Sequence, residues 1–409
     1  MTISDARGET TRRPPAKGPF DGLLIADFGR VLAGPYATML LADLGATVIK
    51  VESAAGDETR SWTPPQRDGE STYYLSINRN KNSIVLDLAD QDDLRVARRL
   101  AERADVVTEN FKPGGMKRFG LDYASVSATN PAVVYASITG FGTAGGAGLP
   151  GYDLLVQAMS GMMTLTGPED GEGYRSGVAV FDVITGLHTA IGIVTALYHR
   201  ERTGEGQHVE LNLLSSALSG LVNQTGGYLL SGKVPTRLGN DHPSIYPYAP
   251  FPTADGELVL TIGNDAQFGA LCDALGLAGV AADPRFCSNA LRSAHRSELR
   301  PLLVARLAGA TAQEWFERLS ALRLPCAPVL DVAGGIAFAE SIGLDPVVTA
   351  GTGERAMPGI RHPITFSRTP ADYRLGPPAL GQDGDSIRAW LEGTDELDPQ
   401  TMTEEGQPA

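Results

Sequence analysis

Asp182 is the residue whose setting in the sequence most favours covalent chemistry. It precedes a run without charge, because residues 183–197 contain no Asp, Glu, Lys or Arg. Such a run predicts a buried helix, and an acid at its start has two interpretations. It is either a cap or first-turn carboxylate that the helix dipole favours, or a carboxylate nucleophile in a site that excludes water. The pattern alone favours the first interpretation, since first-turn acids are common.

The familiar nucleotide and hydrolase motifs are absent from the chain. The first expected turn, at residues 29–34, reads GRVLAG and does not match the dinucleotide fingerprint. There is no Walker loop, nucleophile elbow or Ser-x-x-Lys pair. The six histidines show no metal-ligand spacing, and the three cysteines form no Cys-x-x-Cys pair. We therefore expect no metal, NAD or other cofactor.

The charge of the chain excludes one class of partner. The 409 residues contain 34 Lys and Arg against 48 Asp and Glu, a net charge of −14, which argues against a nucleic-acid surface. The first 17 residues lack the apolar stretch of a secretory signal, and the odd cysteine count fits a reducing compartment. The longest uncharged run is shorter than a membrane span. The expectation is a cytoplasmic protein without nucleic-acid or membrane partners.

The elements that position Asp182 follow an alternating strand and helix pattern. Predicted strands cover 23–28, 47–51, 83–87, 106–108 and 133–138, and predicted helices cover 35–44, 91–104 and 182–201. Residues 203–212 are predicted to form a turn and a further strand. Strand–helix–strand units with short connections form parallel sheets. The expected fold class is α/β, with a Rossmann-like open parallel sheet in a large domain and a smaller α+β domain after it.

Changes of composition along the chain suggest its division into segments. A cluster of prolines between 235 and 252 is typical of a linker. Six glycines between 140 and 151 predict a ligand loop that is mobile and close to the site. The predicted segments are a disordered tail (1–19), a large domain (20–205), a linker (206–245), a small α+β domain (246–330), a return linker with a terminal helix (331–392) and an acidic tail (393–409).

Many short segments, in order, carry a family resemblance. They are DFGRVLAGP at 27–35, LGATVIKVE at 44–52, GD at 56–57 with TR at 59–60, NRNKNSIVLD at 78–87, DVVTENFKPG at 105–114, RFG at 118–120, GYD at 151–153, TGEGQ at 203–207, DPRF at 283–286 and PCAPV at 325–329. Together they resemble CoA-transferase family III (class III), typified by formyl-CoA:oxalate CoA-transferase, over about residues 20–392. That superfamily also contains α-methylacyl-CoA racemases and carnitine CoA-transferase.

The resemblance implies a role for Asp182, which falls on the family's catalytic aspartate. Its carboxylate is expected to attack an acyl-CoA thioester, giving an aspartyl anhydride and then an aspartyl-CoA thioester. Because an ordinary aspartate is ionised at neutral pH, we expect no general base. Coenzyme A (CoA) is then a substrate and not a cofactor.

The other candidate residues also come from the resemblance. Those expected to bind CoA are Val31, Leu86, Asn110, Phe111 and Arg118, with Arg79 and Lys81 as further phosphate ligands; those expected at the active site are Tyr152, Leu32, Gly263, Asn264, Asp265 and Gln267. Core packing is the alternative for Val31, Leu86 and Phe111, and a solvated surface is the alternative for Arg118. In formyl-CoA transferase a glutamine stands at the place of Leu32 and an arginine at that of Ser53. The first difference questions formate and oxalate as substrates.

The resemblance leaves three functions to separate. CoA transfer between carboxylic acids, with small dicarboxylates such as succinate, is favoured. An α-methylacyl-CoA racemase would carry histidine at Tyr152, because inversion needs a proton donor and acceptor and a tyrosine phenol serves poorly near neutral pH. A catalytically silent CoA-binding protein is the third. Family members form interlocked homodimers, and we expect one here.

Overall fold

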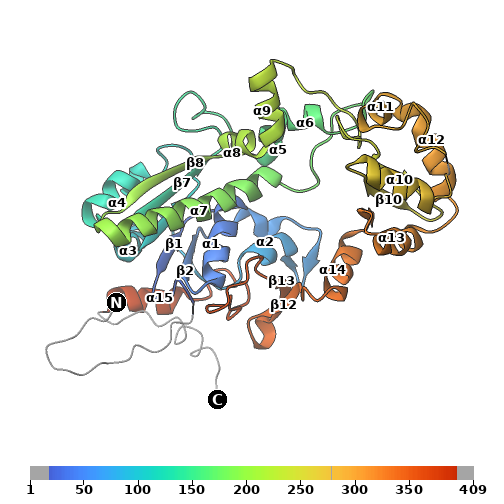
Figure 1. The fold of residues 1–409 in the computed structure, drawn as a ribbon. Helices are drawn as coiled ribbons and strands as arrows, with labels where there is room; N and C mark the ends of the chain where they lie inside the picture. Colours follow the sequence, from blue (N-terminus) through green and yellow to red (C-terminus); the bar gives the residue numbers. More distant parts are fainter. Residues whose placement is uncertain (1–17, 278, 394–409) are drawn as a thin grey trace. The chain divides into compact units, whose positions relative to one another are not determined.

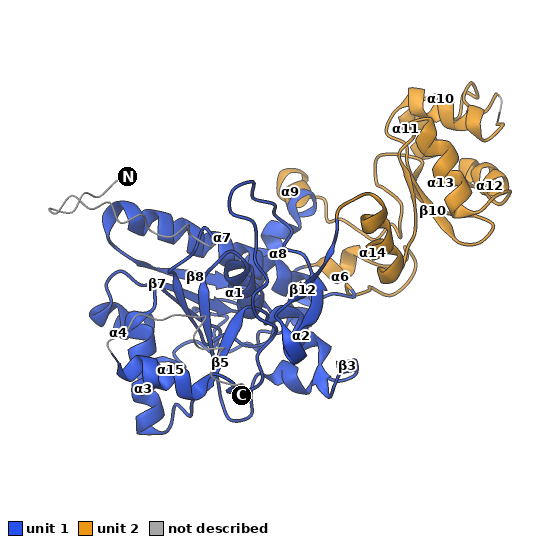
Figure 2. Cartoon of the chain, turned by 90° about the horizontal axis from the view of Figure 1, so that it is seen from below, with its two compact units in different colours: residues 1–160, 177–225, 345–409 blue, residues 161–176, 226–344 orange. Residues whose placement is uncertain are grey.

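The computed structural model describes residues 18–277 and 279–393, so the predicted tails at 1–19 and 393–409 lie almost wholly outside it. The chain forms two compact units, drawn in blue and orange in Figure 2. Unit 1 contains the chain up to 160, residues 177–225 and the chain from 345 onward. Unit 2 contains residues 161–176 and 226–344. The predicted boundary at 205 therefore differs from the observed division.

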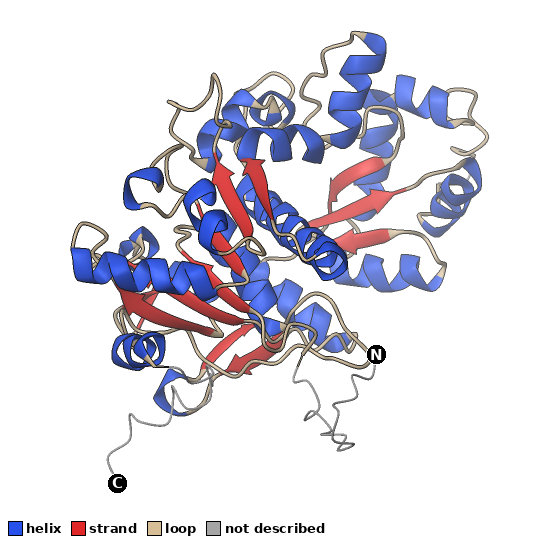
Figure 3. Ribbon diagram, turned by 90° about the vertical axis from the view of Figure 1, so that its left-hand side faces the viewer, coloured by secondary structure: helices blue, strands red, loops and turns tan. Residues whose placement is uncertain are grey.

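Unit 1 is built on a six-stranded sheet, in which every pairing is parallel (Figures 1 and 3). Across the sheet the strands are β5 (Lys81–Val85), β2 (Thr47–Glu52), β1 (Leu24–Asp27), β6 (Val106–Glu109), β7 (Val134–Thr139) and β8 (Gln207–Asn212). The central strands β1, β2, β6 and β7 are buried along nearly their whole length, as is usual for strands of a parallel sheet that helices cover. The predicted Rossmann-like parallel sheet is confirmed.

The helices of unit 1 cover both faces of this sheet. They are α1 (Ala33–Asp43), α2 (Thr72–Ile77), α3 (Gln91–Arg103), α4 (Tyr123–Thr129), α5 (Asp153–Met159), α7 (Val180–Thr203), α8 (Leu213–Gly220) and α15 (Gly384–Glu392). Successive strand residues point to opposite faces. Ile25 and Val106 thus share a core with α1 and α7, whereas Ala26 and Val107 share a core with α3, α4 and α15.

Helix α7 crosses one face of the sheet and carries Asp182 in its first turn. It is 24 residues long, and by length and composition alone it could cross a membrane. The inward residues Thr185, Gly186, Ile193 and Ala196 are buried against α1 and the sheet. Gly186 is necessary there, since a Cβ on it would lie 2.8 Å from the Ala33 carbonyl oxygen. This is the packing of a core helix.

Unit 2 contains an antiparallel sheet in the order β11-β10-β9. Its strands are β9 (Tyr248–Pro252), β10 (Glu257–Thr261) and β11 (Cys326–Pro328), and its helices include α6 (Met162–Leu165), α10 (Asp265–Ala274), α11 (Asn289–Ala294), α12 (Arg296–Leu307), α13 (Ala312–Ala321) and α14 (Val332–Ser341). A core of its own forms around Phe251, Leu260 and Leu303, all fully buried. Helix α9 (Val222–Ser231) spans the junction of the two units.

Both predicted linkers contain regular structure, which corrects the sequence-based division. Residues 206–245 begin with β8, which pairs along its whole length with β7, and continue into α8 and α9. The return segment forms α14 and a hairpin of β12 (Val347–Ala350) and β13 (Met357–Ile360). Proline and glycine density suggested linkers, but tertiary pairing and packing decide the structure of such segments.

Candidate active site

The strand order creates a crevice at the carboxyl ends of β1 and β6. From β1 the chain proceeds to β2 and β5 in one direction across the sheet, and from β6 it proceeds to β7 and β8 in the other. Ligands of open α/β sheets bind at such a switch point. A cavity of about 250 Å³ lies there, lined by Phe28, Arg30, Val51, Glu52, Ser53, Gly56, Asp57, Leu86, Asp87, Leu88, Ala89, Phe111, Arg118 and Phe119.

Three of the predicted CoA-binding residues meet in this cavity. Leu86 follows β5, Phe111 follows β6, and Arg118 lies in a short 3-10 turn, Lys117–Phe119. The Arg118 side chain is exposed, with its guanidinium 4.4 Å from the centre of the Phe119 ring. Ser53, which stands where formyl-CoA transferase has an arginine, lines the same wall. The cavity thus combines apolar walls with a cation at the rim.

The loop after β1 is strained and held in place by two side chains. Val31 has a φ of 68°, a left-handed conformation that is unusual for a β-branched residue. The Asn110 side chain accepts from the Arg30 N–H (3.0 Å) and donates to the Arg30 carbonyl oxygen (2.7 Å). The Asp57 carboxylate accepts from the Val31 N–H at 3.2 Å. A strained backbone that several hydrogen bonds hold in place is typical of ligand-binding loops.

Asp57 is in turn neutralised by a buried lysine. The Lys50 ammonium lies 2.9 Å from Asp57 Oδ2, and both side chains are fully buried. Burial alone would raise the pKa of Asp57, but the charge of Lys50 holds this pKa below its ordinary value. Sequence reasoning found Asp57 only as part of a family motif. Nothing in the sequence indicated the role of Lys50, because a strand pattern does not show which carboxylate a buried lysine will pair with.

Arg79 and Lys81, expected as further phosphate ligands, are instead interior residues. The Arg79 guanidinium pairs with Asp43 at 2.6 Å, and the Lys81 ammonium pairs with Asp27 at 3.1 Å. Burial lowers the pKa of Lys81 to about 8, although Asp27 opposes this shift. Their charges are already satisfied inside the protein, so neither enters the proposal below. The predicted strand begins at residue 83, whereas the observed β5 begins at Lys81.

Asp182 is the third residue of α7, partly buried at its N-terminus. The first-turn position is therefore confirmed. Burial, and then the negative charge of Asp153, raise the pKa of Asp182 to about 7. The expectation that Asp182 is simply ionised at neutral pH is wrong for the unliganded protein. A carboxylate this poorly solvated is also more basic than an ordinary aspartate.

The neighbours of Asp182 come from α5 and α2. Asp153 begins α5 and is buried, and its carboxylate accepts from the Asp182 N–H at 3.2 Å. Tyr152, just before it, is 58% exposed. Tyr73 on α2 has its pKa raised to about 12 by burial and by the charges of Asp182 and Asp153, so its phenol lies within electrostatic range of this pair. Sequence reasoning missed Tyr73, which no spacing links to Asp182.

The glycine-rich segment 140–151 leads directly into these residues. Its two ends meet, because a Cβ on Gly140 would lie 2.4 Å from the Gly151 Cα. Only glycine permits this approach of the two ends. Tyr152 and Asp153 follow directly in the chain. Among the other predicted active-site residues, Leu32 at the start of α1 is only 7% exposed. The predicted place of the loop next to the site is therefore observed, and its mobility stays a prediction.

The active-site residues predicted at 263–267 belong to unit 2. Asn264 caps α10, with its Oδ1 accepting from the Gln267 N–H at 2.9 Å. The Gln267 side chain in turn accepts from the Gly263 N–H at 2.8 Å. Asp265 pairs with the buried Arg292 at 2.8 Å. The backbone N–H groups of Gly263 and Gln267 thus have partners within this segment.

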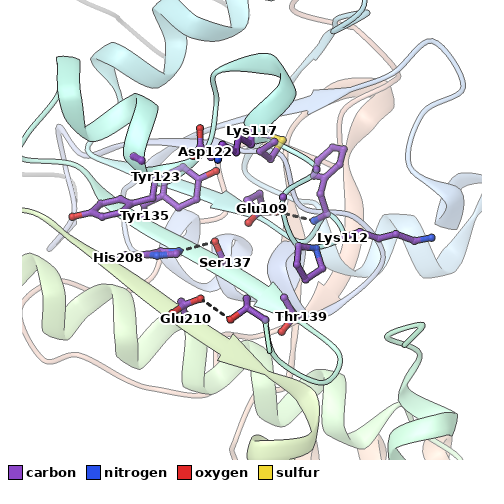
Figure 4. Close-up of a pocket in the computed structure, with 17 residues that line it drawn as sticks. Glu109, Lys112, Lys117, Asp122, Tyr123, Tyr135, Ser137, Thr139, His208 and Glu210 are labelled. Carbon is purple, nitrogen blue, oxygen red and sulfur yellow. Dashed lines mark hydrogen bonds between the residues drawn. The ribbon is translucent and has the colours of Figure 1, made fainter. Parts of the chain in front are cut away.

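A second cavity, of about 290 Å³, lies beside the carboxyl ends of β6, β7 and β8 (Figure 4). In it, Ser137 Oγ and His208 Nε2 are 2.9 Å apart, and the His208 ring stacks on Tyr123 with centroids 4.8 Å apart. Phe111 lines this cavity as well as the first. Sequence reasoning missed this cavity, because the loop 111–117 that lines it meets strand residues that lie far from it in the chain.

Comparison with known proteins agrees with this architecture. The model of CoA-transferase family III matches residues 20–384. Succinate–glutarate CoA-transferase from Agrobacterium fabrum is 43% identical, over 93% of this chain and 98% of that protein. Succinyl-CoA:glutarate CoA-transferase from Mus musculus is 40% identical, over 93% of this chain and 89% of that protein.

A solved structure gives the same result. The crystal structure of a CAIB/BAIF family protein from Brucella suis matches with a TM-score of 0.85 at 41% identity, covering 91% of this chain and 99% of that chain. The parallel sheet, the cavity at its switch point and these matches along nearly the whole chain have one explanation. The protein is an enzyme of the CoA-transferase type and belongs to CoA-transferase family III.

Proposed function

We propose that this enzyme moves CoA from an acyl-CoA to a small dicarboxylic acid, with Asp182 as the covalent carrier. The observation that carries the proposal is the carboxylate of Asp182 itself. It lies at a helix N-terminus in poor contact with water, and its pKa is raised to about 7 by burial and by Asp153. A basic, weakly solvated carboxylate suits attack on a thioester carbonyl.

The reaction proceeds through balanced exchanges. A carboxylate oxygen of Asp182 bonds to the thioester carbon, and the C–S bond breaks to give an aspartyl anhydride and CoA thiolate. The thiolate bonds to the aspartyl carbon and releases the donor acid, leaving an aspartyl-CoA thioester. The acceptor carboxylate attacks this thioester, and the same steps in reverse give the new acyl-CoA and free Asp182.

The cavity at the switch point supplies a site for the nucleotide end of CoA. Leu86 and Phe111 offer apolar walls for the adenine, and the exposed Arg118 offers a guanidinium for the phosphates. Asn110 and Asp57 act indirectly, because they hold the Val31 loop that forms the neighbouring edge. These contacts anchor CoA equally in every step of the reaction.

Dicarboxylates are the substrates that two observations favour. The names of the relatives from Agrobacterium fabrum and Mus musculus specify succinate, succinyl-CoA and glutarate. Leu32 stands where formyl-CoA transferase has a glutamine, and its side chain is buried. A polar contact for oxalate is therefore missing. Longer diacids such as succinate and glutarate also carry methylene groups that suit apolar contacts.

The test is a matrix of donors and acceptors followed by mass spectrometry. Succinyl-CoA, glutaryl-CoA and formyl-CoA are each offered with succinate, glutarate and oxalate. Exchange between succinyl and glutaryl groups should exceed exchange with formyl-CoA or oxalate by at least about tenfold. Activity confined to formyl-CoA and oxalate would overturn the substrate assignment. Deuterium entering C2 of a 2-methylacyl-CoA in heavy water would instead indicate a racemase.

A further inference from the structure

The N-terminus of α7 is capped by a residue from a different helix. The N-cap residue, Ala179, has no side-chain oxygen to accept from the first turn. Asp153 supplies it instead, since its Oδ1 accepts from the N–H groups of Phe181 (2.8 Å) and Asp182 (3.2 Å). Free N–H groups in a first turn need such partners. The backbone of the nucleophile is thus bonded directly to a second carboxylate.

Asp153 is itself held firmly. It is only 8% exposed, and its other oxygen, Oδ2, accepts from Gln157 Nε2 at 2.5 Å. Gln157 lies one turn further along α5 and is also buried. Both carboxylate oxygens therefore have protein donors, and the orientation of Asp153 is determined by contacts on two helices.

We propose that Asp153 is a positioning residue for the transfer reaction, which fixes Asp182 in the first turn of α7 and keeps a second negative charge beside it. This inference rests on the proposed function of Asp182. Asp153 has no need to touch substrate, because it acts through the backbone N–H and the charge of its neighbour.

The charge of Asp153 has a defined direction of effect. The titratable groups that interact electrostatically with Asp182 are Asp153 on α5 and the Tyr73 phenol on α2. Repulsion between like charges disfavours ionisation, so removal of the Asp153 charge should lower the pKa of Asp182. Burial is the larger cause of the raised pKa and remains in such a variant, so the shift should be partial. A less basic carboxylate is also a weaker nucleophile.

Two substitutions separate the hydrogen bonds from the charge. Asp153→Asn keeps an acceptor for both N–H groups but removes the charge and the bond that Oδ2 accepts from Gln157, whereas Asp153→Ala removes all of these. Asp331→Asn is the matched control, since Asp331 caps α14 through the Gly334 N–H at 2.7 Å. All three are compared with wild type in kcat, in KM for succinyl-CoA and in the pH profile of kcat/KM.

For the wild type, kcat/KM should rise with pH through about 7, because Asp182 must be ionised to attack. Asp153→Asn should move this acid limb to lower pH by roughly half a unit to one unit, with a modest fall in kcat. Asp153→Ala should lower kcat by about 10- to 100-fold, with KM changed less than about twofold. Asp331→Asn should match the wild type.

An acid limb that does not move in Asp153→Asn would overturn the electrostatic part. A folded Asp153→Ala with the kcat of the Asp331→Asn control would overturn the positioning part. If Asp153→Ala does not fold, as circular dichroism reports, Asp153→Leu, which fills similar space without an acceptor, replaces it in this comparison. An Asp182→Ala variant that retains turnover would contradict the proposed function itself, and this result is independent of both Asp153 outcomes.

Discussion

At the scale of single residues, two carboxylates near the site have opposite environments. Asp57 faces the Lys50 ammonium, which holds its pKa below the ordinary value against the effect of burial. Asp182 faces Asp153, and burial together with that charge raises its pKa to about 7. The first is a structural anion that braces a loop. The second is the carboxylate that we propose to react, and environments that push the pKa values of two acids apart are typical of acids with different roles.

Replacing the proposed nucleophile should stop CoA transfer and leave CoA binding intact. Asp182→Asn is nearly isosteric and cannot form the anhydride, so kcat should fall by at least about 10³-fold. The dissociation constant for CoA, measured by calorimetry, should stay within about threefold, because Asp182 does not line the nucleotide cavity. Turnover above a few per cent of wild type would remove Asp182 from the mechanism.

Arg118 should affect binding and not the chemical step. Arg118→Ala removes the exposed guanidinium at the rim of the cavity, so KM for acyl-CoA should rise by about 5- to 20-fold while kcat changes little. Arg95→Ala is the control, because Arg95 is an exposed arginine on α3 that pairs with Asp92. Equal KM values for both variants would return Arg118 to the solvated surface.

At the scale of elements, buried ion pairs join the strands to the loops that bear the site. Lys50 in β2 donates to the Gly29 carbonyl oxygen (3.0 Å) and to Asp57, and Asp57 accepts from Val31. The left-handed Val31 is thereby connected to the centre of the sheet. These contacts explain how a strained loop keeps one conformation.

Breaking that connection should destabilise the fold and weaken CoA binding together. Lys50→Met leaves the Asp57 carboxylate buried without its partner, which should lower the free energy of unfolding by roughly 3–5 kcal/mol. Urea denaturation measures this loss, and KM for acyl-CoA should rise as the loop loosens. The surface variant Arg95→Ala should show neither effect. A Lys50→Met protein as stable as wild type would contradict the bracing role.

The sequence predicted some elements well, for physical reasons. Apolar runs and helical periodicity depend on local chemistry, so the parallel sheet and helices such as 91–104 were predicted. The strand predicted within 203–212 is observed as β8, but its pairing with β7 is a tertiary event, so its residues were divided between the large domain and a linker. Lys81 was misassigned for the same reason, since nothing local reveals its partner Asp27. The contact of Asp153 with the Asp182 backbone spans 29 residues and had no sequence signal.

At the scale of the whole molecule, unit 1 exposes an apolar stripe on the outward face of α7. Leu187, Ile191, Val194 and Tyr198 are 40%, 63%, 41% and 65% exposed. Their spacing places them on one face of the helix. A contiguous exposed apolar surface marks an interaction site, and the family resemblance makes a second copy of this chain the expected partner.

We therefore expect an obligate homodimer that buries well over about 2,000 Å², the scale of permanent interfaces. Light scattering should give a mass near twice the 43.1 kDa of one chain, unchanged on dilution. Ile191→Glu should shift the mass toward one chain, because a charge would be desolvated in the interface. Glu102→Lys, an exposed change on α3, is the control. A stable, active species of one-chain mass in the wild type would contradict the dimer.

The most direct test of the central claim is to trap the covalent intermediate on Asp182. The enzyme is incubated with succinyl-CoA without an acceptor and then treated with hydroxylamine or borohydride, and its peptides are analysed by mass spectrometry. The account predicts modification of the peptide at Asp182 alone, and none in the Asp182→Ala variant. Full turnover without any modified peptide, or modification elsewhere that persists in Asp182→Ala, would contradict it.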